Sequence, residues 1–107
     1  MSQLEKTVEA IEEALAAVVR PVAREEVWVT HYGAFDIHPR HLAYWLCVKT
    51  DAEKQRLIAD ETLMRKLREV LVAYAYPPEG RDSVHIGFES QETVDRESGG
   101  NWWHHWK

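Results

Sequence analysis

The spacing of apolar residues changes along this chain, and that change is the feature that most constrains its fold. Near the N-terminus, five apolar residues recur at alternating steps of four and three, the stripe of an amphipathic helix: Leu4, Val8, Ile11, Leu15 and Val18. Ser2 and Glu5 have the spacing of a capping box, so the helix should begin there. Pro21 cannot continue a helix, and we expect the helix to end before it.

A second helical region follows Thr50 and Glu53, which repeat the capping-box spacing. Its apolar residues keep a helical phase as far as the prolines at 77 and 78: Leu57, Leu63, Met64, Leu67, Val70, Leu71 and Tyr74. Asp60 is a second candidate N-cap within this region. The region is therefore predicted either as one helix or as a short helix over 52–59 and a longer one over 60–75.

Four other segments favour strands. Residues 25–32 and 41–50 are rich in β-branched and aromatic types and are joined by a connection suited to a wide hairpin. Residues 82–89 alternate apolar and polar side chains, which is typical of a half-buried strand. Residues 102–106 are aromatic and follow a glycine-rich turn, so we expect a fourth strand that returns along the third.

The predicted order of elements is α-β-β-α-β-β, in one domain that spans residues 1–107. Connected hairpins and amphipathic helices favour an α+β fold. We expect a two-layer sandwich in which both helices cover one face of an antiparallel sheet. The other face of that sheet then becomes the place to look for function.

Composition weighs against several classes of protein. The formal net charge of −5 disfavours nucleic acid, because phosphate contacts need a surplus of Lys and Arg. The lone cysteine, Cys47, lies in an apolar run and is expected to be a buried thiol. No apolar leader and no apolar run of membrane-spanning length is present, so the sequence predicts a cytoplasmic protein without membrane contact.

Charged runs on the predicted helices have two interpretations. Arg65, Lys66 and Arg68 are interpreted as a solvated helix face. The glutamates of the first helix, at positions 5, 9, 12 and 13, form either a solvated face or a contact surface for a basic partner.

The six histidines raise an enzymatic alternative. A metal-dependent or acid-base site would be built from His31, His38, His41 and His85 with nearby carboxylates, or from the acidic segment 89–97 with His85 or His104. His38 and His41 straddle a proline, which makes convergence on one metal ion harder, and no nucleophile-elbow motif is present. We therefore expect no metal, no cofactor and no catalytic residue.

Tryptophan is the most unusual component, with five residues in 107 and three of them in the last six positions. A strand places successive side chains on opposite faces, so some of the aromatic residues must lie on the face that the helices leave open. The predicted binding residues are Trp28, Tyr44, Trp102, Trp103 and Trp106, with Tyr32 and Trp45 in the same cluster. Three roles stay open for them: a lid over the chain's own sheet, a surface for a partner or a second copy, and a small-ligand groove.

The sequence therefore predicts a small non-catalytic domain that binds another protein or a second copy of itself. Its binding surface would be an aromatic sheet face with an acidic rim, formed by the carboxylates of the segment 89–97. An inhibitor or immunity-type protein that neutralises a basic partner is one concrete version, because opposite charge speeds encounter and suppresses wrong partners. The alternative is the small metal-dependent or acid-base enzyme.

Overall fold

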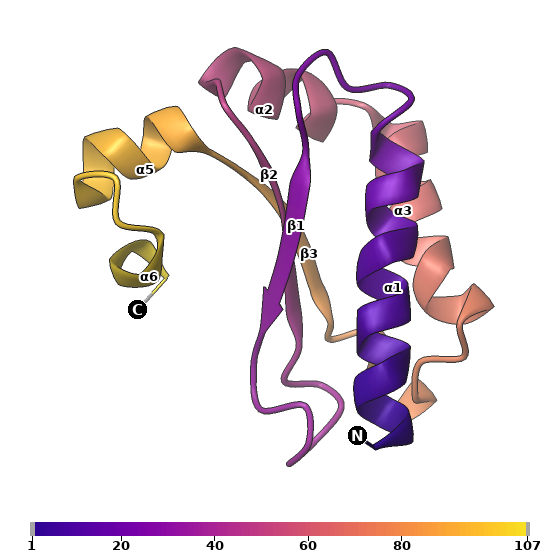
Figure 1. Cartoon of the computed structure of the whole chain (residues 1–107). Coiled ribbons are helices and arrows are strands. Elements are labelled where there is room, and N and C mark those ends of the chain that lie inside the picture. Colours follow the sequence, from indigo (N-terminus) through magenta and orange to yellow (C-terminus); the bar gives the residue numbers. More distant parts are fainter. Residues whose placement is uncertain (1, 107) are drawn as a thin grey trace.

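A computed structural model describes residues 2–106, which form an α+β fold (Figure 1). The elements in chain order are α1 (Gln3–Val19), β1 (Trp28–Tyr32), β2 (Ala43–Val48), α2 (Asp51–Ile58), α3 (Glu61–Ala73), α4 (Pro78–Arg81), β3 (His85–Ser90), α5 (Gln91–Ser98) and α6 (Trp102–His105). The α+β class expected from the sequence is confirmed.

The predicted helix starts are confirmed by their caps. The side chains of Ser2, Thr50 and Asp60 accept hydrogen bonds from backbone N–H groups three residues ahead, at the first turns of α1, α2 and α3. The second helical region is thus two helices, as the cap at Asp60 suggested. Arg20, directly before Pro21, ends α1.

The sheet has the strand order β1-β2-β3 and is mixed. β1 and β2 pair antiparallel, which confirms the predicted hairpin. β2 and β3 pair parallel, so the expectation of a fully antiparallel sheet is wrong. The reason is the connection: α2 and α3 carry the chain back along the length of the sheet, so β3 starts at the same end as β2.

The fourth strand predicted over 102–106 is also wrong, because this segment forms the short helix α6. The Asn101 side chain accepts a hydrogen bond from the His104 N–H at 2.9 Å and caps that helix. The polar stretch before it is helical too: Ser90 caps α5, and Gly99, with a φ of 58°, ends it. Local capping thus outweighs the strand preference of the tryptophans.

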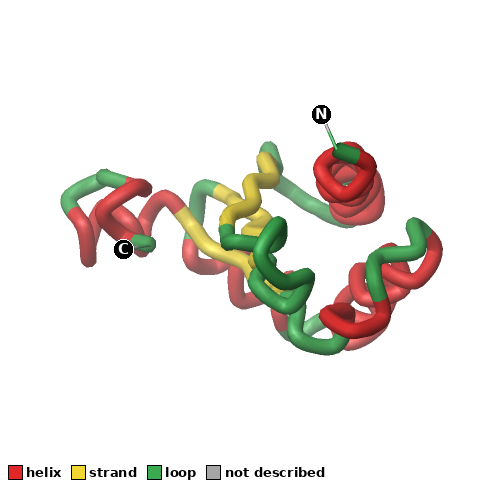
Figure 2. The backbone as a smooth tube through the Cα atoms, turned by 90° about the horizontal axis from the view of Figure 1, so that it is seen from below, coloured by secondary structure: helices red, strands yellow, loops and turns green. Residues whose placement is uncertain are grey.

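Helices lie on both faces of the sheet. Figures 1 and 2 show α1 and α3 on one side and α5 and α6 on the other. The first side holds the main core, whose fully buried members include Val8, Ile11, Leu15, Tyr44, Leu46, Leu67 and Leu71. The expected two-layer arrangement with one open face therefore fails at the C-terminal end, where α6 covers the second face. None of the helices within residues 2–106 has the length and apolar character needed to cross a bilayer.

Candidate functional site

The second face of the sheet carries an unusual set of side chains. Strand register places on this face Trp28, Thr30 and Tyr32 from β1, Trp45 and Cys47 from β2, and His85, Gly87 and Glu89 from β3. The apolar residues of β2 and β3 that alternate with them belong to the main core on the other face: Tyr44, Leu46, Val48, Ile86 and Phe88. The second face is thus aromatic over β1 and β2 and polar at the end of β3.

The C-terminal residues 101–106, here called the aromatic lid, cover this face. Trp106 stacks on Trp45 with ring centroids 5.5 Å apart and an interplanar angle of 22°. Trp102 meets Trp28 edge-on at 5.5 Å and approaches Trp106 at 5.2 Å. The Trp102 indole N–H donates to the Gln91 Oε1 at 2.8 Å. Trp102 and Trp106 thus form a lid over the chain's own sheet, the first of the three roles considered for these residues.

A glycine makes room for this packing. Gly87 lies opposite Trp45 in the parallel pair of strands. A Cβ atom at position 87 would be 3.0 Å from the Trp45 ring and 2.6 Å from the His85 ring. These two rings lie with their centroids 4.8 Å apart over the glycine. Gly87 therefore allows the indole to lie flat against the backbone of β3.

A chain of polar contacts anchors the lid. The His105 Nε2 lies 2.8 Å from the Glu89 Oε2, and the His105 Nδ1 lies 2.9 Å from the Ser98 hydroxyl. The Lys54 ammonium donates to the other Glu89 oxygen at 2.9 Å. The Glu89, His105 and Lys54 side chains are only 11%, 12% and 14% exposed. When Nε2 carries the imidazole proton, His105 donates to Glu89 and accepts from Ser98, which fixes the ring and the lid with it.

The partner of Glu89 is a histidine that the sequence analysis did not single out. The enzymatic alternative paired the acidic segment 89–97 with His85 or His104, whereas Glu89 contacts His105. His105 lies on the opposite side of the predicted strand from His104, but in a helix the two project about 100° apart. The signal that would have identified His105 is therefore the N-cap residue Asn101, which starts a helix over the last residues.

Two carboxyl groups near the anchor, Asp51 and Glu89, have lowered pKa values. Hydrogen bonds from Ser90, Thr93 and Arg96 hold the pKa of Asp51 well below its ordinary value. Burial acts to raise the pKa of Glu89, but hydrogen bonds from Lys54 and His105 outweigh it and leave the pKa below its usual range. Both groups are thus held as anions in the folded chain.

We expect acid to destabilise the protein as the pH falls below about 4.5. The pKa values of Glu25, Asp51, Glu53 and Glu89 are all lowered in the folded chain. The unfolded chain therefore takes up protons first, and the stability that these groups contribute is lost as the pH falls through their folded pKa values. Urea unfolding at a series of pH values measures the slope of the free energy of unfolding against pH. Asp51→Asn should reduce the proton uptake on unfolding by about one proton; an unchanged slope would contradict the assignment.

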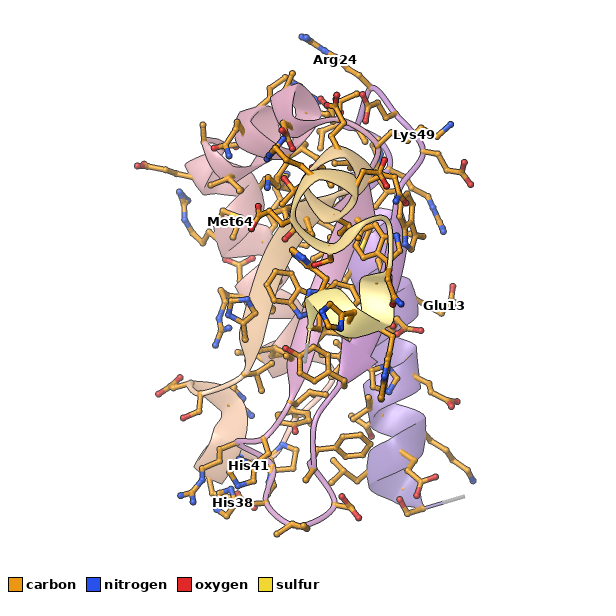
Figure 3. The ribbon with its side chains drawn as sticks, turned by 90° about the vertical axis from the view of Figure 1, so that its left-hand side faces the viewer. Glu13, Arg24, His38, His41, Lys49 and Met64 are labelled. Atoms are coloured by element: carbon orange, nitrogen blue, oxygen red, sulfur yellow. The ribbon has the colours of Figure 1, made fainter. Side chains whose placement is uncertain are left out.

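A groove runs between the lid and β1. It has a volume of about 450 Å³ and is lined by Thr30, His31 and Tyr32 of β1 and by Trp103 and Trp106 of the lid. Trp103 is 76% exposed and Tyr32 is 44% exposed. Figure 3 shows α6 in front of the sheet, with α1 and the labelled Glu13 beside it. The lid thus leaves one apolar concavity at the edge of the sheet.

The predicted binding residues separate into two groups. Trp28, Trp102, Trp103 and Trp106 belong to the second face or its lid. Tyr44 lies on the opposite face, fully buried, and its hydroxyl donates to the Val8 carbonyl oxygen at 2.7 Å. Tyr44 therefore fastens β2 to α1 and has no surface to offer a partner.

The histidines proposed for a metal or acid-base site do not converge. His31 meets the Glu12 carboxylate at 2.7 Å, and His85 lies against Trp45. His38 and His41 lie together at the hairpin tip, with ring centroids 6.1 Å apart (Figure 3). Within residues 2–106, no group of three or more His, Cys, Asp or Glu side chains is placed to hold a metal ion.

Cys47 should report on opening of the lid. It is fully buried on the second face, and burial raises the pKa of its thiol to about 12. At pH 8 we expect an aromatic disulfide reagent to modify native protein at least tenfold more slowly than urea-unfolded protein. Trp106→Ala should accelerate the reaction, because it removes the ring stacked on Trp45. Rapid, complete modification of the native wild-type chain would contradict the burial.

Comparison of the chain with protein-family models, with curated proteins and with solved structures found no match. A fold class alone does not specify a function, which depends on the chemistry of the site.

Proposed function

We propose that this chain is a non-catalytic protein-binding domain, and that its partner docks in the groove between β1 and the aromatic lid. The observation that carries the proposal is Trp103, which stands 76% exposed at the rim of that groove. A large aromatic side chain beside an apolar concavity has the character of an interface hot spot. Tyr32 and Trp106 supply the walls against which an inserted side chain would pack.

Charge supports a basic partner. The chain carries a net charge of −5, and three carboxylates of α5, at 92, 95 and 97, are exposed beside the lid. Glu89, expected on this acidic rim, is buried in the lid anchor instead. Like charges oppose a second copy as the occupant, and they also oppose nucleic acid. An inhibitor or immunity-type protein that neutralises a basic partner in the cytoplasm remains the concrete form of the proposal.

Substitution of the exposed tryptophan tests the proposal. Immobilised wild type, Trp103→Ala and Val72→Ala would be exposed to extract of the protein's own cells, and retained proteins quantified by mass spectrometry. Val72 is the matched control, since it is an exposed apolar residue on α3. The partner recovered would then be purified and titrated by calorimetry.

We expect wild type and Val72→Ala to bind this partner equally, and Trp103→Ala to bind it at least about 30-fold more weakly, the loss typical of a hot spot. Sedimentation velocity over a range of concentrations detects a second copy as the partner. A partner retained equally by Trp103→Ala, or no retained protein and a monomer at all concentrations, would refute the proposal.

One observation favours the enzymatic alternative. Ser98, His105 and Glu89 form a continuous hydroxyl, imidazole and carboxylate chain, the order needed to activate a serine. Acyl transfer also needs free N–H donors for the oxyanion. The N–H groups of Gly99 and Gly100, next to Ser98, both already bond to the Val94 carbonyl oxygen.

We therefore expect a fluorophosphonate probe to leave Ser98 unmodified under conditions that label a serine hydrolase completely. Stoichiometric labelling that Ser98→Ala abolishes would replace the binding proposal with the enzymatic one.

A further inference from the structure

The outer edge of β1 is open. β1 is the terminal strand of the sheet, and within residues 2–106 no other strand pairs with its outer side. The direction of its backbone groups follows from β2. The Leu42 carbonyl oxygen accepts a hydrogen bond from the His85 N–H. The backbone N–H and C=O groups of Leu42 and of every second residue after it are therefore directed toward β3. The backbone groups of the residues between them, Ala43, Trp45 and Cys47, are directed toward β1.

Register then identifies the open backbone groups. Ala43, Trp45 and Cys47 lie opposite Tyr32, Thr30 and Trp28, so those three residues of β1 face β2. The two that alternate with them, Val29 and His31, direct their N–H and C=O groups outward. The open edge thus offers two donors and two acceptors at a spacing that an extended chain can match.

The two sides of this edge differ in chemistry. On one side lies the groove, with Tyr32, Trp103 and Trp106 among its walls. On the other side lies α1, where the Glu12 Oε1 is 2.7 Å from the His31 Nδ1. Glu5 and Glu9 precede Glu12 at steps of three and four, so they share its stripe of the helix and line the same side. We call Glu5, Glu9 and Glu12 the acidic stripe.

We propose that an extended segment of a basic partner protein adds to β1 as a further strand of the sheet. Alternate side chains of such a segment point to opposite sides. Apolar side chains on one side enter the groove, and Lys or Arg side chains on the other side meet the acidic stripe. The inference rests on the proposed function and names the chemistry of the partner. A second copy would bring its own acidic stripe close to this one, and a nucleic acid would bring its phosphates close to the stripe. Both contacts would join like charges and are therefore unfavourable.

Synthetic peptides test this mode of binding in the full chain. The probe is a nine-residue peptide with lysine at odd positions and valine or phenylalanine at even positions; its matched control has glutamate for lysine. Two further peptides, isomers of each other, carry four N-methyl groups each, on odd residues 3–9 or on even residues 2–8 of the probe. They have the same side chains and charge, but each lacks the N–H donors of one edge.

We expect the lysine peptide to bind at least tenfold more tightly than the glutamate peptide, with the Val29 and His31 amides protected from hydrogen exchange. Because a strand bonds a neighbour through alternate residues, methylation of one set should abolish binding and methylation of the other should leave it unchanged. Glu5→Gln with Glu9→Gln should weaken binding severalfold. Glu61→Gln with Glu69→Gln on α3 makes the same charge change away from β1 and should not.

Three results would overturn the inference, and they differ from failure of the proposed function. If both methylated isomers bind equally, with changes confined to the Trp103 and Trp106 signals, the groove binds side chains without strand addition and the proposed function stands. Equal binding of the lysine and glutamate peptides would contradict the inference that the partner segment is basic. Absence of binding at millimolar peptide refutes strand addition, while the partner-retention experiment decides the proposed function separately.

Discussion

Replacing Glu89 with alanine is expected to lower the free energy of unfolding by about 3–5 kcal/mol, the usual cost of removing one partner of a buried ion pair. The Glu89 side chain is 11% exposed and accepts hydrogen bonds from Lys54, His105 and the backbone N–H of Ser90. Its removal leaves the Lys54 ammonium desolvated and releases the anchor of the lid. Urea denaturation followed by circular dichroism measures the loss.

Two variants control this experiment. Glu97→Ala removes a carboxylate from the same region, but Glu97 is 57% exposed and 3.9 Å from Arg96, so its loss should change the free energy by less than about 0.5 kcal/mol. Glu89→Leu combined with Lys54→Met should recover part of the lost stability, since no buried charge is left unpaired. A loss below about 1 kcal/mol for Glu89→Ala would show that Glu89 does not anchor the lid.

Two tryptophans of the same lid should differ sharply in their contribution to stability. Trp106 stacks on Trp45 and contacts Trp102, whereas Trp103 is 76% exposed. We expect Trp106→Ala to lower the free energy of unfolding by about 2–4 kcal/mol, somewhat less than truncation of a fully buried aromatic residue. Trp103→Ala should change it by less than about 1 kcal/mol while weakening partner binding.

The buried indole nitrogens moderate this expectation. Neither the Trp45 nor the Trp106 Nε1–H has a hydrogen-bond partner within the described residues. An unsatisfied buried donor costs about 1–3 kcal/mol, which offsets part of the stacking. Equal losses of stability for Trp106→Ala and Trp103→Ala, measured by urea denaturation, would contradict the packing of the lid.

Helices and the first hairpin were predictable because their signals are local. Ser2, Thr50 and Asp60 each cap a helix through a residue three positions ahead, and apolar stripes of helical period follow them. The hairpin of β1 and β2 needs only neighbouring segments and a connecting loop. Such features depend on a few adjacent residues, so a single sequence is enough to place them.

The parallel pairing of β3 and the helical lid depend on more distant or competing effects. Aromatic residues favour strands, but at 102–106 the Asn101 cap favours a helix instead, after the glycines at 99 and 100 have ended α5. The faces of the sheet raise the same difficulty. Tyr44 and Trp45 are neighbours in one strand and must point to opposite faces, but which of them faces α1 depends on packing between distant elements.

The contact between Trp106 and Trp45 tests most directly whether the C-terminal segment covers its own sheet. Nuclear Overhauser spectra of a mixture of labelled and unlabelled chains separate contacts within one molecule from contacts between molecules. We expect cross-peaks between the two indole rings within one molecule, together with helical chemical shifts over 102–105. Extended shifts over that segment, or cross-peaks found only between molecules, would contradict the lid and the groove that it forms with β1.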